Sequence, residues 1–359
     1  PNAEADITGI SFEEDVLANS YIDLNPSYDE SQNAYPIRIS VKESTDMTSL
    51  APIFELTPGA TISPASGSVQ NFTTPVRYTV TSEDKAWHRV YAITAREQKA
   101  SNIPTTYHFE KVRIMQNVWQ EFYEEQDSGN ELTWASGNKG FKWAMSEAAT
   151  EDYPTTQIDN GKTGKCVKLE TRLTGDLGNM VGMPIAAGNL FIGSFDMLNA
   201  ITNPLSATRF GTPFYNKPLR LTGYYKYKAG EQFYENGEYT SRKDIFNIYA
   251  IFYDGVKYDS AGKGTDVTLD GNLPNQNYEH SSMVALALVS NPQETEGDEW
   301  KFFDIPFDYQ RYGKKIDEAR LAKGEYKIGI IFASSKDGAT FEGAPGSTLL
   351  IDEVELIYE

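Results

Sequence analysis

The sequence PLRLTGYYKYK, residues Pro218–Lys228, predicts a long β-strand with two different faces. Successive side chains of a strand point to opposite sides, so every second residue from Leu219 to Tyr227 lies on one face. The segment DIFNIYAIFY, Asp244–Tyr253, repeats this pattern, with Phe, Ile and Ala on one face and Ile, Asn and Tyr on the other. Such strands indicate a sheet that is buried on one side. Its second side, with Tyr and Asn, is typical either of a sugar-binding surface or of an ordinary sandwich exterior.

The remainder of the second half of the chain also favours β-structure. Short alternating runs are broken by Gly, Pro, Asn and Asp, which is typical of β-sandwiches. Clear strands are predicted at Trp300–Phe307, Glu325–Ala333 and Thr348–Tyr358. Residues 310–322 allow a short helical turn. The Gly-, Asn- and Asp-rich stretch 260–280 predicts a long loop, and such loops are usually functional or mobile in a compact domain.

The first hundred residues form a separate block of short strands divided by turn clusters, which matches an immunoglobulin-like sandwich. The polar stretch REQKASNIPTT that follows is typical of an interdomain linker. The chain is therefore expected to be all-β, with an immunoglobulin-like sandwich at 1–98, a linker at 99–106 and a larger jelly-roll β-sandwich at 107–359. The strands predicted in the first domain are Ile7–Phe12, Tyr21–Leu24, Tyr35–Val41, Ile53–Leu56, Thr61–Ser63, Val76–Val80 and His88–Ala95.

Size and charge limit the classes of partner. A chain of 359 residues is long enough for two cores. Its formal net charge of −19 repels nucleic acid and anionic membrane surfaces, because phosphate binding needs clustered cations. This charge suits neutral ligands and divalent cations, or it serves solubility alone. The single cysteine, Cys166, cannot form an internal disulfide. The sequence has no apolar run long enough to span a membrane and no signal peptide, and its start at Pro1 is typical of a mature or trimmed N-terminus.

Several catalytic motifs are missing from the sequence. It contains no GxSxG, HExxH or P-loop motif. His88, His108 and His280 lie far apart without ligand spacing, which argues against a histidine-based zinc site and a serine triad. Glycoside hydrolysis needs two carboxylates that flank the sugar. Glu353 and Glu355 share a face of the last strand, but that face could equally point to solvent, so the hydrolase remains an alternative.

Sugar binding without catalysis needs flat aromatic rings for the C–H face of a pyranose and planar polar groups for its hydroxyls. Trp119, Trp134, Trp143, Tyr224 and Tyr225 are the aromatic residues considered, and core or edge packing is the alternative for each. Trp143 follows two glycines in GNKGFKWA, which favours an exposed position at a loop or strand start. The carbohydrate-binding candidates are Trp143, Tyr225, Asp244, Asn247, Arg209 and Ser335.

A calcium site is a further possibility raised by the two ends of the second domain. Glu110 lies on its first predicted strand and Asp352 on its last. The first and last strands of a sandwich often pair, so these carboxylates could converge, and calcium prefers oxygen ligands. The alternative is that both are simply solvated. No other cofactor is required.

Four segments carry a family resemblance. From Tyr107 onward the chain resembles the putative carbohydrate metabolism domain of Bacteroidetes surface proteins. In the first domain, FELTPGATISPASG and YTVTSEDKAWHRVYAITA resemble the immunoglobulin-like modules that precede such domains. The four segments are AAGNLFIGSF (Ala186–Phe195), GTPFYNKPLRLTGYYKYKAGE (Gly211–Glu231), WKFFDIPFDY (Trp300–Tyr309) and FASSKDGATFEGAPGSTLLIDEVEL (Phe332–Leu356).

The resemblance implies a jelly-roll sandwich similar to carbohydrate-binding modules and some glycosidases. It also implies export, as an outer-membrane or cell-surface lipoprotein whose anchor lies outside this chain, with the periplasm as the alternative. We expect an exported glycan-binding protein whose ligand, a polysaccharide or oligosaccharide, is held on a face of the jelly roll. Other glycan-utilisation proteins of the outer membrane are candidate partners, and nucleic acid is not. The alternatives are a glycoside hydrolase and a structural or adhesion module. The first domain is expected to act as a spacer, so deleting residues 1–100 should leave ligand binding intact.

Overall fold

The computed structural model describes residues 1–359. The strand predicted at Pro218–Lys228 is present over those residues as β19, near the centre of a sheet. Two antiparallel neighbours flank it, β29 (Thr348–Tyr358) on one side and β27 (Lys301–Pro306) on the other. Beyond β29 the sheet continues through β12 (Lys165–Glu170) to β11 (Thr155–Asp159), and β7 (Thr106–Tyr107) also pairs with β29. We call this six-stranded sheet, β11-β12-β29-β19-β27 with β7, sheet I.

A second sheet is built around the other strongly patterned segment. Strand β22 (Asn247–Asp254) lies between β28 (Tyr326–Ala333) and β26 (Met283–Leu288), and all pairs are antiparallel. Strands β15 (Asn189–Phe191) and β18 (Thr212–Pro213) both pair with β28. We call this sheet sheet II. Together the two sheets confirm the all-β sandwich that the sequence predicts for the second part of the chain.

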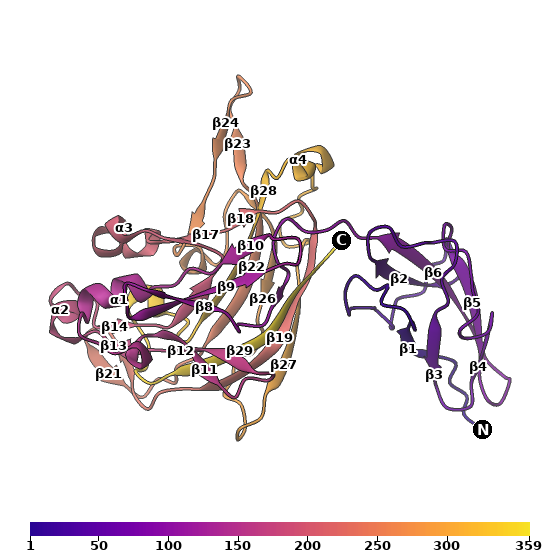
Figure 1. Cartoon of the computed structure of the whole chain (residues 1–359), viewed down its shortest axis with the longest axis horizontal. Coiled ribbons are helices and arrows are strands. Elements are labelled where there is room, and N and C mark those ends of the chain that lie inside the picture. Colours follow the sequence, from indigo (N-terminus) through magenta and orange to yellow (C-terminus); the bar gives the residue numbers. More distant parts are fainter. The chain divides into compact units, whose positions relative to one another are not determined.

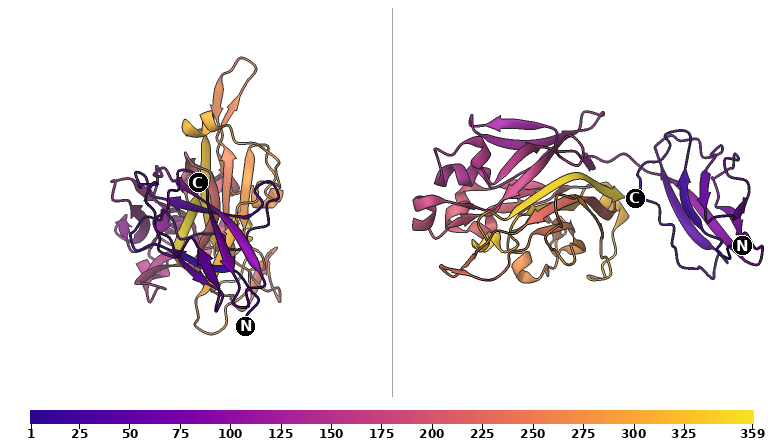
Figure 2. Two further views of the ribbon diagram at one scale, coloured as in Figure 1. Left: turned by 90° about the vertical axis from the view of Figure 1, so that its right-hand side faces the viewer. Right: turned by 90° about the horizontal axis from the view of Figure 1, so that it is seen from below.

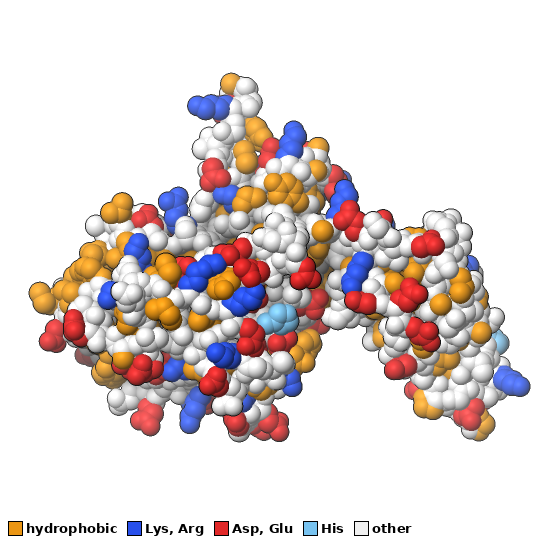
Figure 3. All heavy atoms as spheres, viewed as in Figure 1, with side chains coloured by type: hydrophobic (Ala, Val, Ile, Leu, Met, Phe, Trp, Pro, Cys, Tyr) orange, Lys and Arg blue, Asp and Glu red, His pale blue; other side chains and the backbone are white.

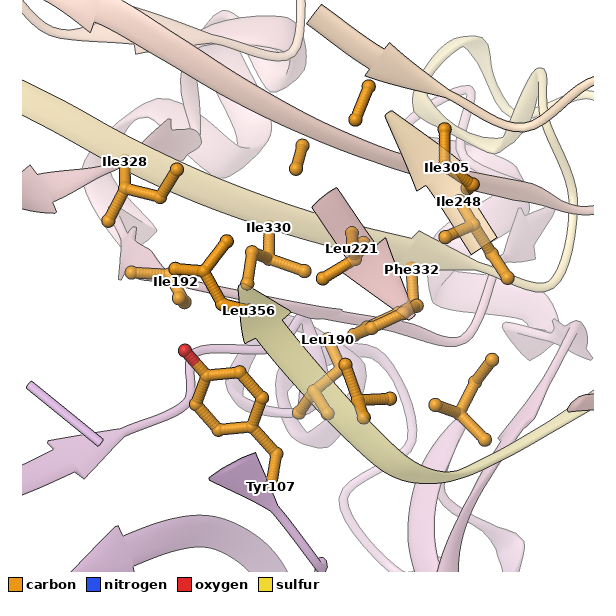
Figure 4. Packing of buried hydrophobic residues seen from close by; sticks show 14 of the residues in the cluster. Tyr107, Leu190, Ile192, Leu221, Ile248, Ile305, Ile328, Ile330, Phe332 and Leu356 are labelled. Atoms are coloured by element: carbon orange, nitrogen blue, oxygen red, sulfur yellow. The ribbon is translucent and has the colours of Figure 1, made fainter. Parts of the chain in front are cut away.

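The main hydrophobic core lies between the two sheets (Figure 4). Sheet I contributes the face of β19 that carries Leu221, Tyr225 and Tyr227, because the alternate residues of that strand all point inward. Sheet II contributes the corresponding apolar face of β22 and β28. The buried residues labelled in Figure 4 are Tyr107, Leu190, Ile192, Leu221, Ile248, Ile305, Ile328, Ile330, Phe332 and Leu356.

The outer face of sheet II is covered as well, which differs from the one-sided burial expected for this strand pattern. Tyr249 and Tyr253 of β22 pack with Leu269, Leu273 and Tyr278 in a second cluster. These three residues come from the predicted loop 260–280, which folds back over the sheet instead of leaving it open. The Tyr and Asn face of β22 is therefore mostly core. The segment contains β24 (Gly264–Asp266), β25 (Leu269–Asp270) and the 3-10 helix η3 (Pro274–Gln276), and β24 forms with β23 (Val256–Tyr258) a hairpin that projects from the unit (Figure 1).

A small three-stranded sheet closes one side of the sandwich, and it lies above the long strand β29 in the right-hand view of Figure 2. Its strands are β8 (Val112–Met115), β9 (Trp119–Glu125) and β10 (Glu131–Thr133). The remaining short elements of the second unit are α1 (Asn138–Ala144), η1 (Thr150–Asp152), β13 (Arg172–Leu173), α2 (Gly175–Met180), β14 (Ile185–Ala186), β16 (Gly193–Phe195), α3 (Met197–Thr202), η2 (Pro204–Ser206), β17 (Thr208–Phe210), β20 (Phe233–Glu235), β21 (Glu238–Thr240), α4 (Glu318–Ala322) and η4 (Gly338–Thr340).

The chain divides into two units, Pro1–Ala100 and Ser101–Tyr358. Part of the predicted linker belongs to the second unit. Asn102 donates a side-chain hydrogen bond to the carbonyl oxygen of Pro213, and the N–H of Leu356 donates to the carbonyl oxygen of Thr105. Ile103 is buried in the main core. No helix in the chain is both long enough and apolar enough to cross a membrane.

The first unit is the smaller sandwich, with its own core drawn from both of its sheets. One sheet has the order β2-β6-β5-β4 and the other pairs β1 with β3. The strands predicted from the sequence are present with boundary shifts of at most two residues, except Tyr21–Leu24, which forms no strand. The observed strands are β1 (Ile7–Ser11), β2 (Tyr35–Val41), β3 (Ile53–Leu56), β4 (Thr61–Ser63), β5 (Val76–Thr81) and β6 (His88–Glu97).

Two adjacent tyrosines lie on opposite faces of β19, so replacing them should lower the free energy of unfolding by different amounts. Tyr225 is 3% exposed in the main core, so Tyr225→Ala should lower the free energy of unfolding by about 3–5 kcal/mol. Tyr224 points to the outer face, so Tyr224→Ala should cost less than about 1 kcal/mol. Urea unfolding of the two variants measures both values. Equal losses would contradict the facing of this strand.

Candidate functional site

A cavity of about 190 Å³ lies at one end of the second unit, between the uncovered part of the outer face of sheet II and the helices α1, α2 and α3. Figure 3 shows hydrophobic side chains gathered on the surface at this end. The cavity brings together three of the sequence-predicted residues, Trp143, Asn247 and Ser335. Most of its lining is apolar, and the aromatic members are Phe141, Trp143, Phe191, Phe195, Phe210, Tyr249 and Phe341.

Local structure explains how Trp143 reaches the mouth of this cavity. The side chain of Asn138, at the start of α1, is fully buried and donates to the carbonyl oxygens of Gln120 and Thr155, which fixes the helix. Phe141 then packs against Tyr153, with 5.2 Å between ring centroids. Residues two apart on a helix point to different sides, so Trp143 turns outward and is 38% exposed. The exposure expected for Trp143 is therefore observed, although it lies in a helix rather than in a loop or strand.

The polar groups of the cavity are few and mostly engaged. Asn247 is 4% exposed and donates from Nδ2 to the hydroxyl oxygen of Tyr278 at 3.0 Å. Ser335 is also buried. No Asp or Glu lines the cavity. A carboxylate pair for glycoside hydrolysis is thus missing from this place.

Asp244 and Ser335 form a buried structural network, so the sequence-based assignment of both to hydroxyl recognition needs correction. One carboxylate oxygen of Asp244 accepts from the hydroxyls of Ser335 at 2.6 Å and Ser347 at 2.7 Å, and from the N–H of Ala344 at 2.8 Å. The hydroxyl of Ser335 also lies 2.6 Å from that of Thr171. Burial raises the pKa of Asp244 although these hydrogen bonds oppose the shift. The network ties the start of β22 to the segment before β29.

Tyr225 cannot offer its ring to a sugar either, because it points into the core and its ring packs against that of Phe246. Trp119 and Trp134 are likewise buried. Arg209, on β17, is exposed and lies 3.9 Å from Asp196, outside the cavity lining. The aromatic side chain on the outer face of β19 is Tyr224, the neighbour of Tyr225, and it is half-buried.

Three aromatic residues form an open strip on the outer face of sheet I, and we call them the aromatic platform: Tyr224, Trp300 and Phe302. Tyr224 on β19 and Phe302 on β27 are directly paired across the strands, with ring centroids 5.2 Å apart. Phe302 is 53% exposed, which is unusual for a Phe on a sheet face. Trp300 precedes β27 on the same side of the chain, two residues before Phe302.

Charged side chains border the aromatic platform. The ammonium of Lys162 lies 4.9 Å from the Tyr224 ring centroid, and that of Lys226 lies 5.0 Å from the Trp300 ring. Lys226 also pairs with the fully exposed Asp298 at 2.7 Å. At the other end of the strip, Arg220 pairs with Asp304 at 2.6 Å. The platform thus combines partly exposed ring surface with ion pairs at both ends, in which Asp298 is fully exposed and the cations are largely buried.

A separate open groove of about 690 Å³ holds the best placed carboxylates. Glu147, Asp152 and Glu170 line it together with Arg172. Arg172 lies 3.2 Å from Glu170 and 3.7 Å from Asp152. The pair considered from the sequence, Glu353 and Glu355, lines neither the cavity nor this groove. A β-bulge at Glu353, where φ is 47°, interrupts the alternation on which their shared face was inferred.

The carboxylates proposed for calcium do converge, but on backbone N–H groups. Glu110 accepts from the N–H of Lys165 at 2.7 Å, and Asp352 accepts from that of Thr163 at 3.0 Å. Both carboxylates therefore hold the same turn, the 160–165 segment. The carboxylate oxygens that a calcium ion would need are occupied by these N–H donors. The structure contains no group of three or more His, Cys, Asp or Glu that could hold a metal ion. Calcium stays a prediction without geometric support.

The comparisons with known proteins agree with this architecture. Residues 108–357 match the family described as putative carbohydrate metabolism domain. The chain belongs to this family. Residues 23–95 match the family described as SGBP, N-terminal, a domain of surface glycan-binding proteins. A search of curated proteins finds no match.

Two solved structures are similar to this chain. A putative glycoside hydrolase from Bacteroides vulgatus is 50% identical, with a TM-score of 0.67, and the match covers 72% of this chain and 100% of that one. A putative glycoside hydrolase from Bacteroides thetaiotaomicron is 44% identical, with a TM-score of 0.64, and the match covers 100% of this chain and 98% of that one. Sequence and fold similarity thus extend over both units.

Removing the Asp244 carboxylate should destabilise the second unit. Asp244→Ala leaves two buried hydroxyls and one N–H without their acceptor, at about 1–3 kcal/mol for each unsatisfied group. We expect a loss of at least about 3 kcal/mol in urea unfolding. The matched control Asp127→Ala, at an exposed position, should change the value by less than about 0.5 kcal/mol. A loss no larger than in the control would refute the structural role.

The buried carboxyl of Asp352 should lower the free energy of unfolding as the pH rises and the group loses its proton. Burial raises its pKa to about 6 in the folded chain, against about 3.9 when unfolded. The folded state therefore holds the proton more tightly, and its advantage, complete below pH 4, is lost as the pH passes through 6. The unfolding free energy of Asp352→Asn minus that of the wild type should increase between pH 4 and pH 7, by at most about 3 kcal/mol. Urea titrations across this range test it, and a constant difference would contradict it.

Proposed function

We propose that this protein binds glycans at the cell surface through the aromatic platform of its second unit. The observation that carries the proposal is the Tyr224–Phe302 pair on the outer face of sheet I, in which Phe302 is 53% exposed and Tyr224 is half-buried. A contiguous group of apolar rings on a sheet face is typical of a ligand-binding surface, and the C–H face of a pyranose is the flat, half-apolar surface that such rings accept. A strand-spanning strip suits a chain of sugars rather than a single residue.

The border of the platform supplies what the hydroxyls of a sugar need. Lys162, Lys226 and Arg220 present N–H donors, and Asp298 and Asp304 present acceptors. A few placed polar groups around an apolar contact give orientation and specificity. The net charge of −19 favours neutral glycans over acidic ones. The membership of the chain in a carbohydrate-related family supports the same ligand class.

The cellular setting of the proposal follows from the first unit. Its match to the SGBP N-terminal family supports a place at the cell surface. We infer that the protein is exported and held there as an outer-membrane lipoprotein through a segment outside these residues, and that it works beside other glycan-utilisation proteins. The first unit then serves as a spacer for the second.

A glycoside hydrolase is the second candidate, and one observation favours it. The open groove contains Glu147, Asp152 and Glu170, and retaining or inverting hydrolysis needs two such carboxylates on either side of a sugar bond. The two solved relatives carry the words putative glycoside hydrolase in their descriptions. The ion pairs of Arg172 with two of these carboxylates would have to open for catalysis.

Calorimetric titration against a panel of neutral polysaccharides tests the platform. Tyr224→Ala and Phe302→Ala should each weaken binding about ten-fold, since losing about 1.4 kcal/mol of stacking has that effect. Tyr239→Ala removes an exposed tyrosine from β21 and serves as the matched control, with no expected change. Equal affinities for all four proteins would overturn the platform. Reducing sugar released by the wild type and not by Glu170→Gln would favour the hydrolase instead.

A further inference from the structure

The apolar cavity is chemically unlike the aromatic platform. It has about 190 Å³ of space, and no carboxylate lines it. A sugar ring placed there would bury most of its hydroxyls against an apolar lining with few polar groups, and each unpaired hydroxyl costs free energy. An apolar group has no such cost. A cavity of about 150 Å³ holds benzene, so this space takes roughly six to eight carbon atoms.

The mouth of the cavity is apolar on the outside as well. The outer side of a surface helix is normally polar. On α2, Met180 is 82% exposed, and on α3, Leu198 is 88% exposed. Leu177 and Ile201 are also exposed. Apolar side chains thus lie on the outside of α2 and α3, two helices that help to line the cavity. They lie at the end of the unit where hydrophobic side chains gather in Figure 3.

One positive charge lies at the cavity. Lys336 is the only charged residue in the lining, and its side chain is exposed. Its ammonium takes part in no ion pair or hydrogen bond, whereas nearby Arg242 is paired with Asp337 at 2.5 Å. In a chain with a net charge of −19, an unpaired cation beside an apolar cavity without carboxylates is complementary to an anionic head group.

We propose that the cavity binds an aliphatic monocarboxylate of medium chain length, with its chain among the aromatic residues and its carboxylate at Lys336. This site is separate from the platform and does not depend on glycan binding. The chain carries the affinity through burial of apolar surface, and the ion pair adds selectivity for the acid over the alcohol. No covalent step is involved.

Calorimetry on the full chain with acetate, hexanoate, octanoate and octan-1-ol tests the site, with octanoate kept below its micelle-forming concentration and octan-1-ol below its solubility limit. Acetate should not bind, and each added CH₂ should tighten binding about three- to four-fold until the cavity is full. Lys336→Gln should weaken octanoate up to about five-fold and leave octanol unchanged. Lys263→Gln, at an exposed lysine near the tip of the β23–β24 hairpin, is the matched control and should change neither.

Two cavity-filling variants locate the chain. Ala200→Phe on α3 and Ala339→Phe on η4 place a ring into the space from surface elements, and each should abolish octanoate binding while circular dichroism and melting temperature stay unchanged. If one variant is unstable, the other gives the answer. The proposal is overturned if octanoate does not bind saturably or if a folded filling variant binds it normally. Equal binding of octanol and octanoate, indifferent to Lys336→Gln, would overturn the carboxylate class.

Discussion

The antiparallel pairing of β19 with β29 is the interaction on which the second unit depends. Two strands of eleven residues each lie side by side at the middle of sheet I, and one of them is the last strand of the chain. Their inward residues, such as Leu221 and Leu356, form one wall of the main core. Because side chains alternate, the same pairing that buries Tyr225 sends Tyr224 outward to its partner Phe302. The same strand register thus places one set of side chains in the core and the other set in the aromatic platform.

Coverage of sheet II decides where a ligand can bind. The segment after β22 returns over the outer face and packs on Tyr249 and Tyr253, so most of that face is closed. The cover stops short at the end that carries Asn247, and the short helices α1, α2 and α3 surround the gap. The cavity is the part of the outer face that the returning segment leaves uncovered. Two surfaces of different chemistry therefore result, an open strip on sheet I and an apolar cavity on sheet II.

Polar side chains, some of them buried, hold the segments that border these surfaces. Asp244 joins the start of β22 to the segment before β29, while Glu110 and Asp352 hold the turn at 160–165. Each carboxylate is kept in place by donors that come from distant parts of the chain. Acidic and hydroxyl side chains that suggest ligand contacts in a sequence can therefore serve only to anchor loops, because an unpaired donor in a core is costly.

The sequence by itself determined the strands and the family. The period-two pattern gave the full extent of β19 and β29, and four segments indicated the carbohydrate-related domain, because both signals are local. It also singled out Trp143 as exposed, although it placed this residue in a loop or strand and the helix that carries it is fixed by Gln120 and Thr155. The tertiary structure alone decided which face of β19 is buried, that Asp244 and Ser335 are internal, and that Glu353 lies in a bulge. These outcomes depend on what packs against a strand from far along the chain, and a periodic pattern describes two faces without saying which of them another segment will cover.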